Sequence, residues 1–512
     1  MLERCAGILI PLFSLRTERD LGRGEIGGLR EMVDLAVAMG HRVIQLLPLD
    51  EPAPGEASPY SALSVFAIDP MYISAAALAD AAELRRAREL TGRRRMPPRA
   101  RLRKVKFELL AHAFDSFERR ASPAERAEFG EFCGENHAWL DDYALFRGLK
   151  EKFKWKLWES WPDELRRRET GALGSARRGL ADSIRKYCYW QYLADRQWRD
   201  IRGYAKSRGV LLGGDLAFSP SRDSAEVWAN QPYFDLTRTV GAPPDDFNPD
   251  GQRWGLPMPN WERMRASGHQ FWRARARRAR SLYDIVRVDH VVGIYRTFSF
   301  AGEDDGGAFT PADEPHQIAQ GEEVMRVILD EAAPAEVIAE DLGTVPPWVR
   351  ASLTRLGVPG YKVVRWERVN WAAPDERFLS PSEYPELSLA TTGTHDTQTL
   401  TQWWRETTVK ERRQFLAALG LEDRASPDGR LTGRASLAIV EALYAAPSRL
   451  AVTPIQDLFG WRARINRPGT VAPSNWRWRL PFTLERWSES ATLRARVTSL
   501  RRIAERSGRF RT

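Results

Sequence analysis

Eight short runs rich in Val, Ile and Leu restrict the fold of this chain more than any other feature of its sequence. The runs lie at residues 7–12, 42–47, 210–218, 285–290, 336–342, 362–366, 387–394 and 450–456. Such runs are typical of strands buried on both faces of a parallel sheet. Helical patterns separate several of them, as at residues 29–39, 322–331 and 347–356. Because a closed barrel needs eight strands with crossover helices, we predict an α/β fold of the (β/α)8 TIM barrel class.

The spacing of the runs predicts two insertions in this barrel. About 160 residues separate the second and third runs, where a single crossover helix normally suffices. We expect a mostly helical inserted subdomain at residues 75–205, with helices at 102–119, 122–133, 137–150 and 183–207. A smaller insertion at residues 219–280 follows the third strand, and a helix at 490–506 closes the chain. The first predicted strand begins at residue 7, so we expect one elaborated barrel domain over residues 1–512 and no separate N-terminal module.

Charge and composition indicate a globular protein without a nucleic-acid partner. Hydrophobic residues make up 43% of the chain, and 77 Lys and Arg face 68 Asp and Glu, for a net charge of +9. Most of the basic residues are Arg scattered along predicted helix faces, where they are solvated. Only residues 92–106 form a locally basic segment, which we interpret as an exposed loop that leads into a helix.

Cysteine use and hydropathy indicate a cytoplasmic location. Cys5, Cys133 and Cys188 lie far apart in the sequence without a Cys-x-x-Cys motif, which predicts neither disulfides nor a zinc site. No stretch reaches the roughly 18 uninterrupted apolar residues of a membrane span. We therefore expect a protein of a reducing compartment, with no membrane partner.

Acidic residues recur at the ends of the predicted strands, where barrel enzymes place their chemistry. They are Asp50, Asp215, Asp289, Glu340 with Asp341, Asp396 and Asp457. Some of them have a simpler interpretation as N-caps of the following helices, and this alternative weighs most for Asp50 and Asp457.

Arg287 and Asp289 form the first candidate catalytic pair. Side chains two residues apart in a strand share a face, so both should point into one pocket. An opposite charge at close range lowers the pKa of a carboxyl group, which suits a nucleophile. The alternative is a structural ion pair.

Glu340 and Asp396 supply the other candidate carboxyl groups. Glu340 follows the apolar residues 337–339, and such an environment raises a pKa and keeps a proton available to a leaving group. Asp341 is expected to face a helix instead. Asp396 adjoins His395, as Asp289 adjoins His290, and this arrangement favours hydrogen bonds to a ligand.

Two carboxyl groups that flank a bond, one ionised and one protonated, are the requirement of glycoside chemistry. The chain also holds 19 Trp, 13 Tyr and 21 Phe. Their flat rings can stack on sugar rings, although most of them are expected to pack in the core or on the surface. The sequence lacks a His-Glu-x-x-His motif, a Walker loop and a dinucleotide fingerprint. We therefore expect no metal and no cofactor, and the residues alone predict a glycosidase-like barrel.

The chain resembles the amylomaltases, or disproportionating enzymes, of the alpha-amylase clan. The resemblance rests on ordered segments along most of the barrel: Pro48-Leu49 with SPYS at 58–61 and SVFA at 64–67, GDL at 214–216, DSAEVW at 223–228, PPD at 243–245, GQRWG at 251–255, RVDH at 287–290, AEDLG at 339–343, GTHD at 393–396, QD at 456–457, RINRPGT at 464–470 and NWRWR at 475–479.

The resemblance implies a 4-alpha-glucanotransferase that acts on alpha-1,4-glucans and maltooligosaccharides. Asp289 would be the nucleophile, Glu340 the general acid/base, and Asp396 the residue that stabilises the transition state. The residues implied to bind the sugar are Tyr60, Asp215, Phe247, Trp254, Arg287, His290, His395 and Asn466.

The chain departs from the family pattern on what the resemblance implies is the acceptor side. Asp246 stands where the family usually has Tyr, Leu256 stands where it usually has Asn, and residues 361–370 differ from the customary apolar stretch. We therefore expect more hydrolysis per transfer event than in a typical member. Two alternatives remain at this point, an alpha-1,4-glucan hydrolase with the same chemistry and a non-catalytic glucan-binding protein, and the oligomeric state is open.

Overall fold

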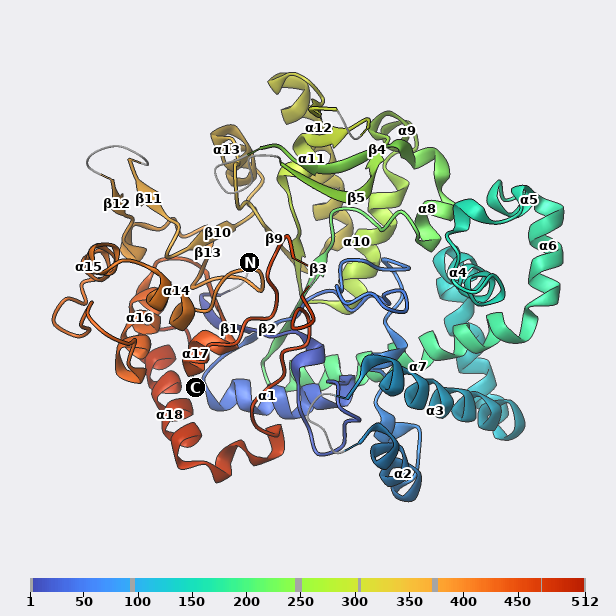
Figure 1. Cartoon of the computed structure of the whole chain (residues 1–512), viewed down its shortest axis with the longest axis horizontal. Coiled ribbons are helices and arrows are strands. Elements are labelled where there is room, and N and C mark those ends of the chain that lie inside the picture. The colour runs from blue at the N-terminus through green and yellow to red at the C-terminus, as the bar shows by residue number, and fades with distance from the viewer. Residues whose placement is uncertain are drawn as a thin grey trace.

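The computed structural model describes residues 3–92, 97–244, 251–302, 305–370, 376–470 and 472–510. Its centre is an eight-stranded parallel sheet with the order β10-β13-β14-β1-β2-β3-β6-β9. The backbone N–H of Ala339 in the last strand donates to the carbonyl of Pro359, which precedes the first, at 3.0 Å. The sheet therefore closes into the predicted (β/α)8 barrel (Figure 1).

Each of the eight predicted runs overlaps one barrel strand, although β1 and β10 begin two residues before their predicted runs. The strands are β1 (Cys5–Leu9), β2 (Val43–Gln45), β3 (Leu211–Leu216), β6 (Ile285–Val288), β9 (Glu336–Ala339), β10 (Gly360–Val363), β13 (Ser388–Thr391) and β14 (Leu450–Pro454). Most strands end earlier than the apolar runs, so that Asp289, predicted within a strand, is the first residue after β6. The candidate carboxylates at 289, 340 and 396 accordingly lie on loops at one end of the barrel.

Helices surround the barrel and pack their apolar faces against it (Figure 1). The predicted helices at 29–39, 322–331, 347–356 and 490–506 are α1 (Leu29–Ala38), α12 (Glu314–Ala332), α13 (Pro347–Arg355) and α18 (Ala491–Arg506). The other helices that follow β3 are α8 (Ala225–Ala229), α9 (Trp261–Ala266), α10 (Gln270–Leu282), α11 (Val292–Tyr295), α14 (Leu400–Glu406), α15 (Val409–Ala418), α16 (Gly433–Ala445) and α17 (Ile455–Phe459).

The residues between β2 and β3 are mostly helical. They form α2 (Ala81–Thr91), α3 (Arg99–Arg120), α4 (Pro123–Lys152), α5 (Asp163–Arg166), α6 (Thr170–Gly179) and α7 (Ala181–Ser207). The prediction of separate helices at 122–133 and 137–150 was wrong, because α4 runs through both without a break. Phe129 and Phe132 before the expected break and Leu140 after it are all buried. One continuous apolar face outweighs the low helix propensity of Gly134 between them.

A second sheet, which the sequence did not predict, lies beside the barrel. It is antiparallel, with the order β5-β4-β7-β8. Its strands are β4 (Phe234–Ala242), β5 (Gln252–Pro259), β7 (Thr297–Phe300) and β8 (Ala308–Thr310), so two come from the insertion at 219–280 and two follow β6. A small hairpin of β11 (Arg368–Val369) and β12 (Arg377–Phe378) follows β10. β5 matters for function because it borders the cleft described below.

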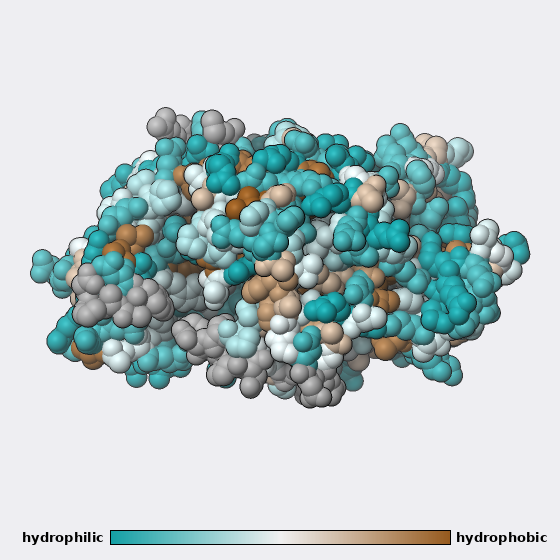
Figure 2. All heavy atoms as spheres, turned by 90° about the horizontal axis from the view of Figure 1, so that it is seen from above, coloured by the Kyte–Doolittle hydropathy of each residue, from teal (hydrophilic) through white to brown (hydrophobic). Residues whose placement is uncertain are grey.

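Figure 2 shows a face that is mostly hydrophilic, with hydrophobic residues in small separate groups. Among the described residues, no helix combines the length and the apolar character needed to cross a membrane.

Candidate active site

Arg287 binds two carboxylates at the mouth of the barrel. Its Nη1 donates to Asp215 Oδ2 at 2.9 Å and to Asp289 Oδ1 at 2.8 Å. Burial alone would lower the pKa of Arg287, but the charges of Asp215 and Asp289 raise it well above its ordinary value. The guanidinium is therefore a fixed positive charge beside Asp289, as the spacing of the two residues predicted.

Tyr60 joins this group from the loop after β2. Its hydroxyl donates to Asp215 Oδ2 at 2.6 Å, and its ring stacks on His395 with centroids 5.4 Å apart and planes 17° apart. The ring of Trp476 lies against both of them, at 6.0 Å from Tyr60 and 5.8 Å from His395. Aromatic faces from three distant segments thus form one wall of the site.

Glu340 follows β9 directly and has few partners. Its Oε2 accepts from the backbone N–H of His290 at 2.9 Å. Burial is the main cause that raises the pKa of Glu340 to about 7, and the charge of Asp289 adds to it, while Arg287 and the His290 N–H oppose the rise. Glu340 can therefore hold a proton near neutral pH and release it within the ordinary working range.

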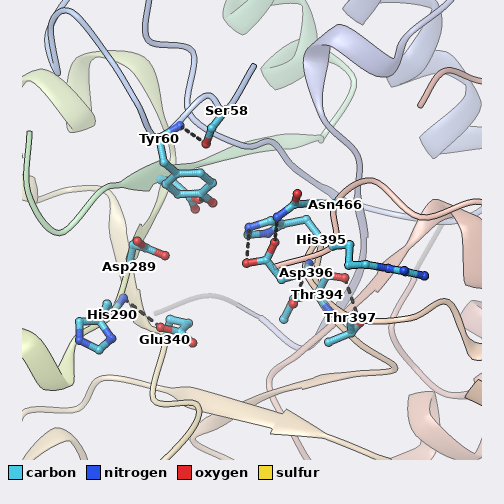
Figure 3. A network of polar contacts seen from close by, with 12 residues as sticks. Ser58, Tyr60, Asp289, His290, Glu340, Thr394, His395, Asp396, Thr397 and Asn466 are labelled. Carbon is cyan, nitrogen blue, oxygen red and sulfur yellow. Dashed lines mark hydrogen bonds and ion pairs between the residues drawn. The ribbon is translucent and has the colours of Figure 1, made fainter. Parts of the chain in front are cut away.

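Asp396 has the opposite environment, although its loop belongs to the same barrel end (Figure 3). The amide of Asn466 donates to its Oδ1 at 2.7 Å, and His395 Nε2 lies 3.4 Å from its Oδ2. Burial alone would raise the pKa of Asp396, but His395 and Asn466 outweigh burial and lower the pKa to about 2. Asp396 is therefore charged over the whole range in which Glu340 titrates.

The loop that carries Asp396 is fixed by a buried arginine that the sequence did not single out. Arg365 Nη2 donates to Thr397 Oγ1 at 2.9 Å and to the carbonyl of Gln398 at 2.6 Å. Thr397 Oγ1 in turn accepts from the backbone N–H of Thr394 at 3.0 Å. An Arg at the end of an apolar strand run was the only signal available in the sequence.

His290 and Trp254 face each other on the side of the second sheet. Their rings meet edge to face with centroids 4.8 Å apart, and Phe218 contacts His290 in the same way at 5.6 Å. Burial lowers the pKa of His290 to about 4, although Asp289 opposes the shift. The imidazole is therefore neutral at neutral pH and can donate one hydrogen bond and accept another.

These groups line one cleft of about 1380 Å³. Eight of the predicted site residues face it: Tyr60, Trp254, Arg287, Asp289, His290, Glu340, His395 and Asp396. Asp215 and Asn466 lie behind this surface and bind Arg287 and Asp396. Phe247 and Asp246 lie outside the described residues. A cleft of this volume accommodates several sugar rings, because ligand pockets of 300–1,000 Å³ already hold drug-sized molecules.

Two further acidic residues at strand ends, Asp341 and Asp457, have structural partners. Asp341 accepts from the backbone N–H of Tyr361 at 2.6 Å and from Arg350 Nε at 3.1 Å, so it faces α13 and β10, as predicted. Asp457 accepts from the N–H of Leu400 at 2.6 Å, at the start of α14. Within the described ranges, no group of His, Cys, Asp and Glu has the arrangement of a metal site.

Comparisons with known proteins agree with this geometry. A family model described as 4-alpha-glucanotransferase, glycoside hydrolase family 77, matches residues 10–484. The chain belongs to this family. A 4-alpha-glucanotransferase of Thermus thermophilus is 34% identical over 94% of this chain and 95% of its own length. One of Chlamydia pneumoniae is 31% identical over 94% and 92%.

A solved structure supports the same assignment. The amylomaltase from Streptococcus agalactiae in complex with acarbose is 27% identical, covers 99% of this chain and 100% of its own, and has a TM-score of 0.85. As a member of the 4-alpha-glucanotransferase family, the chain is an enzyme of the amylomaltase type with a (β/α)8 barrel.

Two further tryptophans of this family member line the cleft. Trp366, at the end of a predicted strand, is 45% exposed and faces the cleft together with Glu367. Trp476 belongs to the NWRWR segment and has a left-handed backbone, with φ of 59°. An exposed indole ring such as that of Trp366 is unusual on a protein surface, and its position in a cleft could not be predicted from composition alone.

Proposed function

We propose that this chain transfers segments of alpha-1,4-glucans to glucose or maltooligosaccharide acceptors by a retaining mechanism centred on Asp289, Glu340 and Asp396. One observation carries the proposal. The cleft pairs Asp289, which lies against a fixed positive charge, with Glu340, whose pKa of about 7 leaves it protonated in half of the molecules at neutral pH. Retaining glycoside chemistry needs one group of each kind.

In the first step, an oxygen of Asp289 attacks the anomeric carbon of the donor glucan as the glycosidic C–O bond breaks. Glu340 gives its proton to the departing oxygen, so the leaving fragment departs as a neutral alcohol. The result is a glycosyl ester on Asp289 and an ionised Glu340.

In the second step, the oxygen of an incoming 4-hydroxyl group attacks the same anomeric carbon. Glu340 accepts the proton of that hydroxyl group. The ester bond breaks, Asp289 returns to its ionised state, and Glu340 is again protonated. Configuration at the anomeric carbon is retained because it is inverted twice.

Asp396 and the groups around it act on the sugar between these steps. A carboxylate with a pKa of about 2 stays charged, accepts hydrogen bonds from sugar hydroxyls, and offsets the positive charge that develops on an oxocarbenium-like transition state. The neutral ring of His290 and the ring of Tyr60, stacked on His395, offer further hydrogen bonds and a flat surface to the same sugar.

The alternative is hydrolysis, in which water takes the place of the sugar acceptor. Product analysis from maltotriose separates the two, because transfer yields glucose and a ladder of longer maltooligosaccharides, whereas hydrolysis yields only shorter ones. In H₂¹⁸O, hydrolysis also places the label in every new reducing end, and transfer leaves the products unlabelled. Shorter, fully labelled products alone would overturn the proposed transfer.

A further inference from the structure

The segment that follows β3 forms part of the cleft wall but belongs to neither a helix nor a strand. Ala217 and Phe218 come directly after β3, and both line the cleft. No backbone N–H of the described residues donates to the carbonyl oxygen of either residue. Buried carbonyl oxygens need a donor, so the position of this wall depends on a side chain.

That side chain is Arg275 of α10, which lies behind the wall. Its Nη1 donates to the carbonyl of Phe218 at 3.3 Å, and its Nη2 donates to the carbonyl of Ala217. Arg275 is 2% exposed, and its guanidinium lies 4.9 Å from the centroid of the Trp272 ring. Arg275 therefore holds both carbonyls at once, from a buried position outside the lining of the cleft.

The charge of Arg275 forms no ion pair with a residue in the described ranges. Burial lowers its pKa to about 10, and the charges of Asp50, Glu226 and Asp289 oppose this shift. Its Nε has no hydrogen-bond partner among the described residues. A buried cation without a close counter-ion is costly, and an apolar side chain could fill the same space. The two carbonyls are thus the contacts that account for an arginine at this position.

The wall that Arg275 holds supports His290. The ring of Phe218 meets the ring of His290 edge to face, with centroids 5.6 Å apart. This corner has no spare space, because a Cβ atom at Gly293 would lie 2.6 Å from His290 Cδ2 and 2.8 Å from Phe218 Cε2. A displacement of Phe218 must therefore move the imidazole or open a gap beside it.

His290 depends on such support more than an ordinary residue does. Its backbone is left-handed, with φ of 47°, a conformation that persists in a bulky residue only when the surroundings hold it. Its backbone N–H donates to Glu340 Oε2 at 2.9 Å (Figure 3), and it directly follows Asp289 in the sequence. His290 thus connects the wall to both carboxyl groups of the proposed reaction.

From these contacts we infer that Arg275 is a positioning residue, which fixes His290 through Phe218 and so fixes the place of the sugar that reacts at Asp289. The inference rests on the proposed function, because the place of His290 affects turnover only if the sugar reacts there. Arg275 acts at the reacting sugar and not on the distant rings of the glucan. Its loss should therefore lower kcat and leave KM nearly unchanged.

Two substitutions of Arg275 test the inference with maltotriose as substrate. Arg275→Met removes both donors, and kcat should fall about tenfold or more, since small misplacements near the reacting atoms are this costly. KM should stay within about twofold of the wild type. Arg275→Lys keeps the charge and one donor group, so it should recover part of the lost kcat.

Arg278→Met is the matched control. Arg278 is also a buried arginine of α10, and its Nε donates to the carbonyl of Phe66 at 2.9 Å. Phe66 does not line the cleft, so Arg278→Met should keep the kcat of the wild type. Thermal unfolding verifies that each variant folds.

The titration of His290, followed by NMR on protein with labelled histidine, tests the same link without turnover. In the wild type, burial lowers the pKa of His290 to about 4, although Asp289 opposes the shift. Once Arg275→Met frees Phe218, water should reach the imidazole and its pKa should rise towards the ordinary value of about 6.5. The titration in Arg278→Met should match the wild type, and His290→Gln assigns the resonance.

Phe218→Leu changes the intermediate contact while Arg275 is kept, so it remains informative if Arg275→Met does not fold. If Arg275 acts through Phe218, the effects of Arg275→Lys and Phe218→Leu on kcat are not additive in the double variant. Additive effects, a wild-type kcat in Arg275→Met, equal losses of kcat in Arg275→Met and Arg278→Met, or an unchanged titration of His290 in folded Arg275→Met would overturn the inference.

Failure of the proposed transfer has a different signature. Shorter, fully labelled products in H₂¹⁸O would overturn the transfer, whereas the titration of His290 in Arg275→Met would still decide whether Arg275 holds the imidazole.

Discussion

The pKa of Glu340 leads to a prediction about the pH dependence of the first chemical step. An unperturbed Glu, with a pKa of about 4.3, would keep its proton in about one molecule in 500 at pH 7. With the pKa raised to about 7, half of the molecules keep it. Because the raised pKa favours the protonated acid, activity should be full at about pH 6 and below, half-maximal near pH 7, and decline about tenfold per pH unit above that.

The assay compares two donors with different needs for that proton. The kcat/KM for glycosylation is measured from pH 5 to 9 with maltotriose and with alpha-maltosyl fluoride, whose fluoride leaves without protonation. General-acid catalysis is worth about 10²–10⁴-fold, so maltotriose should show an alkaline decline with a midpoint near 7 and the fluoride should show little or none.

Glu340→Gln provides the control for this profile. It should lose most of its activity on maltotriose and retain much more on the fluoride, with no alkaline decline for either donor. The same midpoint with both donors in the wild type, or a midpoint near 4.5 with maltotriose, would refute the assignment of Glu340 as the general acid.

Three other substitutions test the remaining parts of the site. Asp289→Asn should abolish turnover without unfolding the protein, and near-normal disproportionation by the folded variant would remove Asp289 from the mechanism. Arg365→Met removes the two hydrogen bonds by which Arg365 holds the loop of Asp396. At about 0.5–1.5 kcal/mol per bond, kcat should fall about tenfold or more. The control Arg405→Met changes an exposed residue and should keep the kcat of the wild type. Leu256→Asn places a polar side chain on the cleft wall. The added acceptor contact should decrease the ratio of new reducing ends to free glucose during maltotriose turnover. An unchanged ratio would show that position 256 does not affect acceptor choice.

The barrel was predictable because its strands are buried on both faces. Continuous apolar runs mark such strands, and each of the eight runs overlaps one. The second sheet gave no such signal. Only Phe234, Val240 and Gly241 of β4 are buried, and they do not alternate with exposed residues. β5 contains Gly255, Pro257 and Pro259, residues that weaken a strand prediction. The pairing of β4 with β7 joins segments that lie before and after β6 in the sequence. No local pattern encodes such a pairing.

The three candidate catalytic carboxylates were predictable for a related reason. In a barrel the ends of parallel strands converge, so Asp289, Glu340 and Asp396 had to approach one another once the strands were placed. Their supporting contacts were not predictable in this way. Asn466 binds Asp396 from 70 residues away, and Arg365 binds Thr397 from 32 residues away, and neither residue follows from the position of a strand end.

These distant contacts determine which carboxyl group can act as the acid. Burial raises the pKa of both Glu340 and Asp396, so burial alone would make them equivalent. Glu340 accepts one backbone hydrogen bond, at 2.9 Å, and faces the charge of Asp289. Asp396 gains His395 and the Asn466 amide. The difference between a pKa of about 7 and one of about 2 thus comes from the partners, and a substitution of Asn466 should raise the pKa of Asp396 while that of Glu340 stays in place.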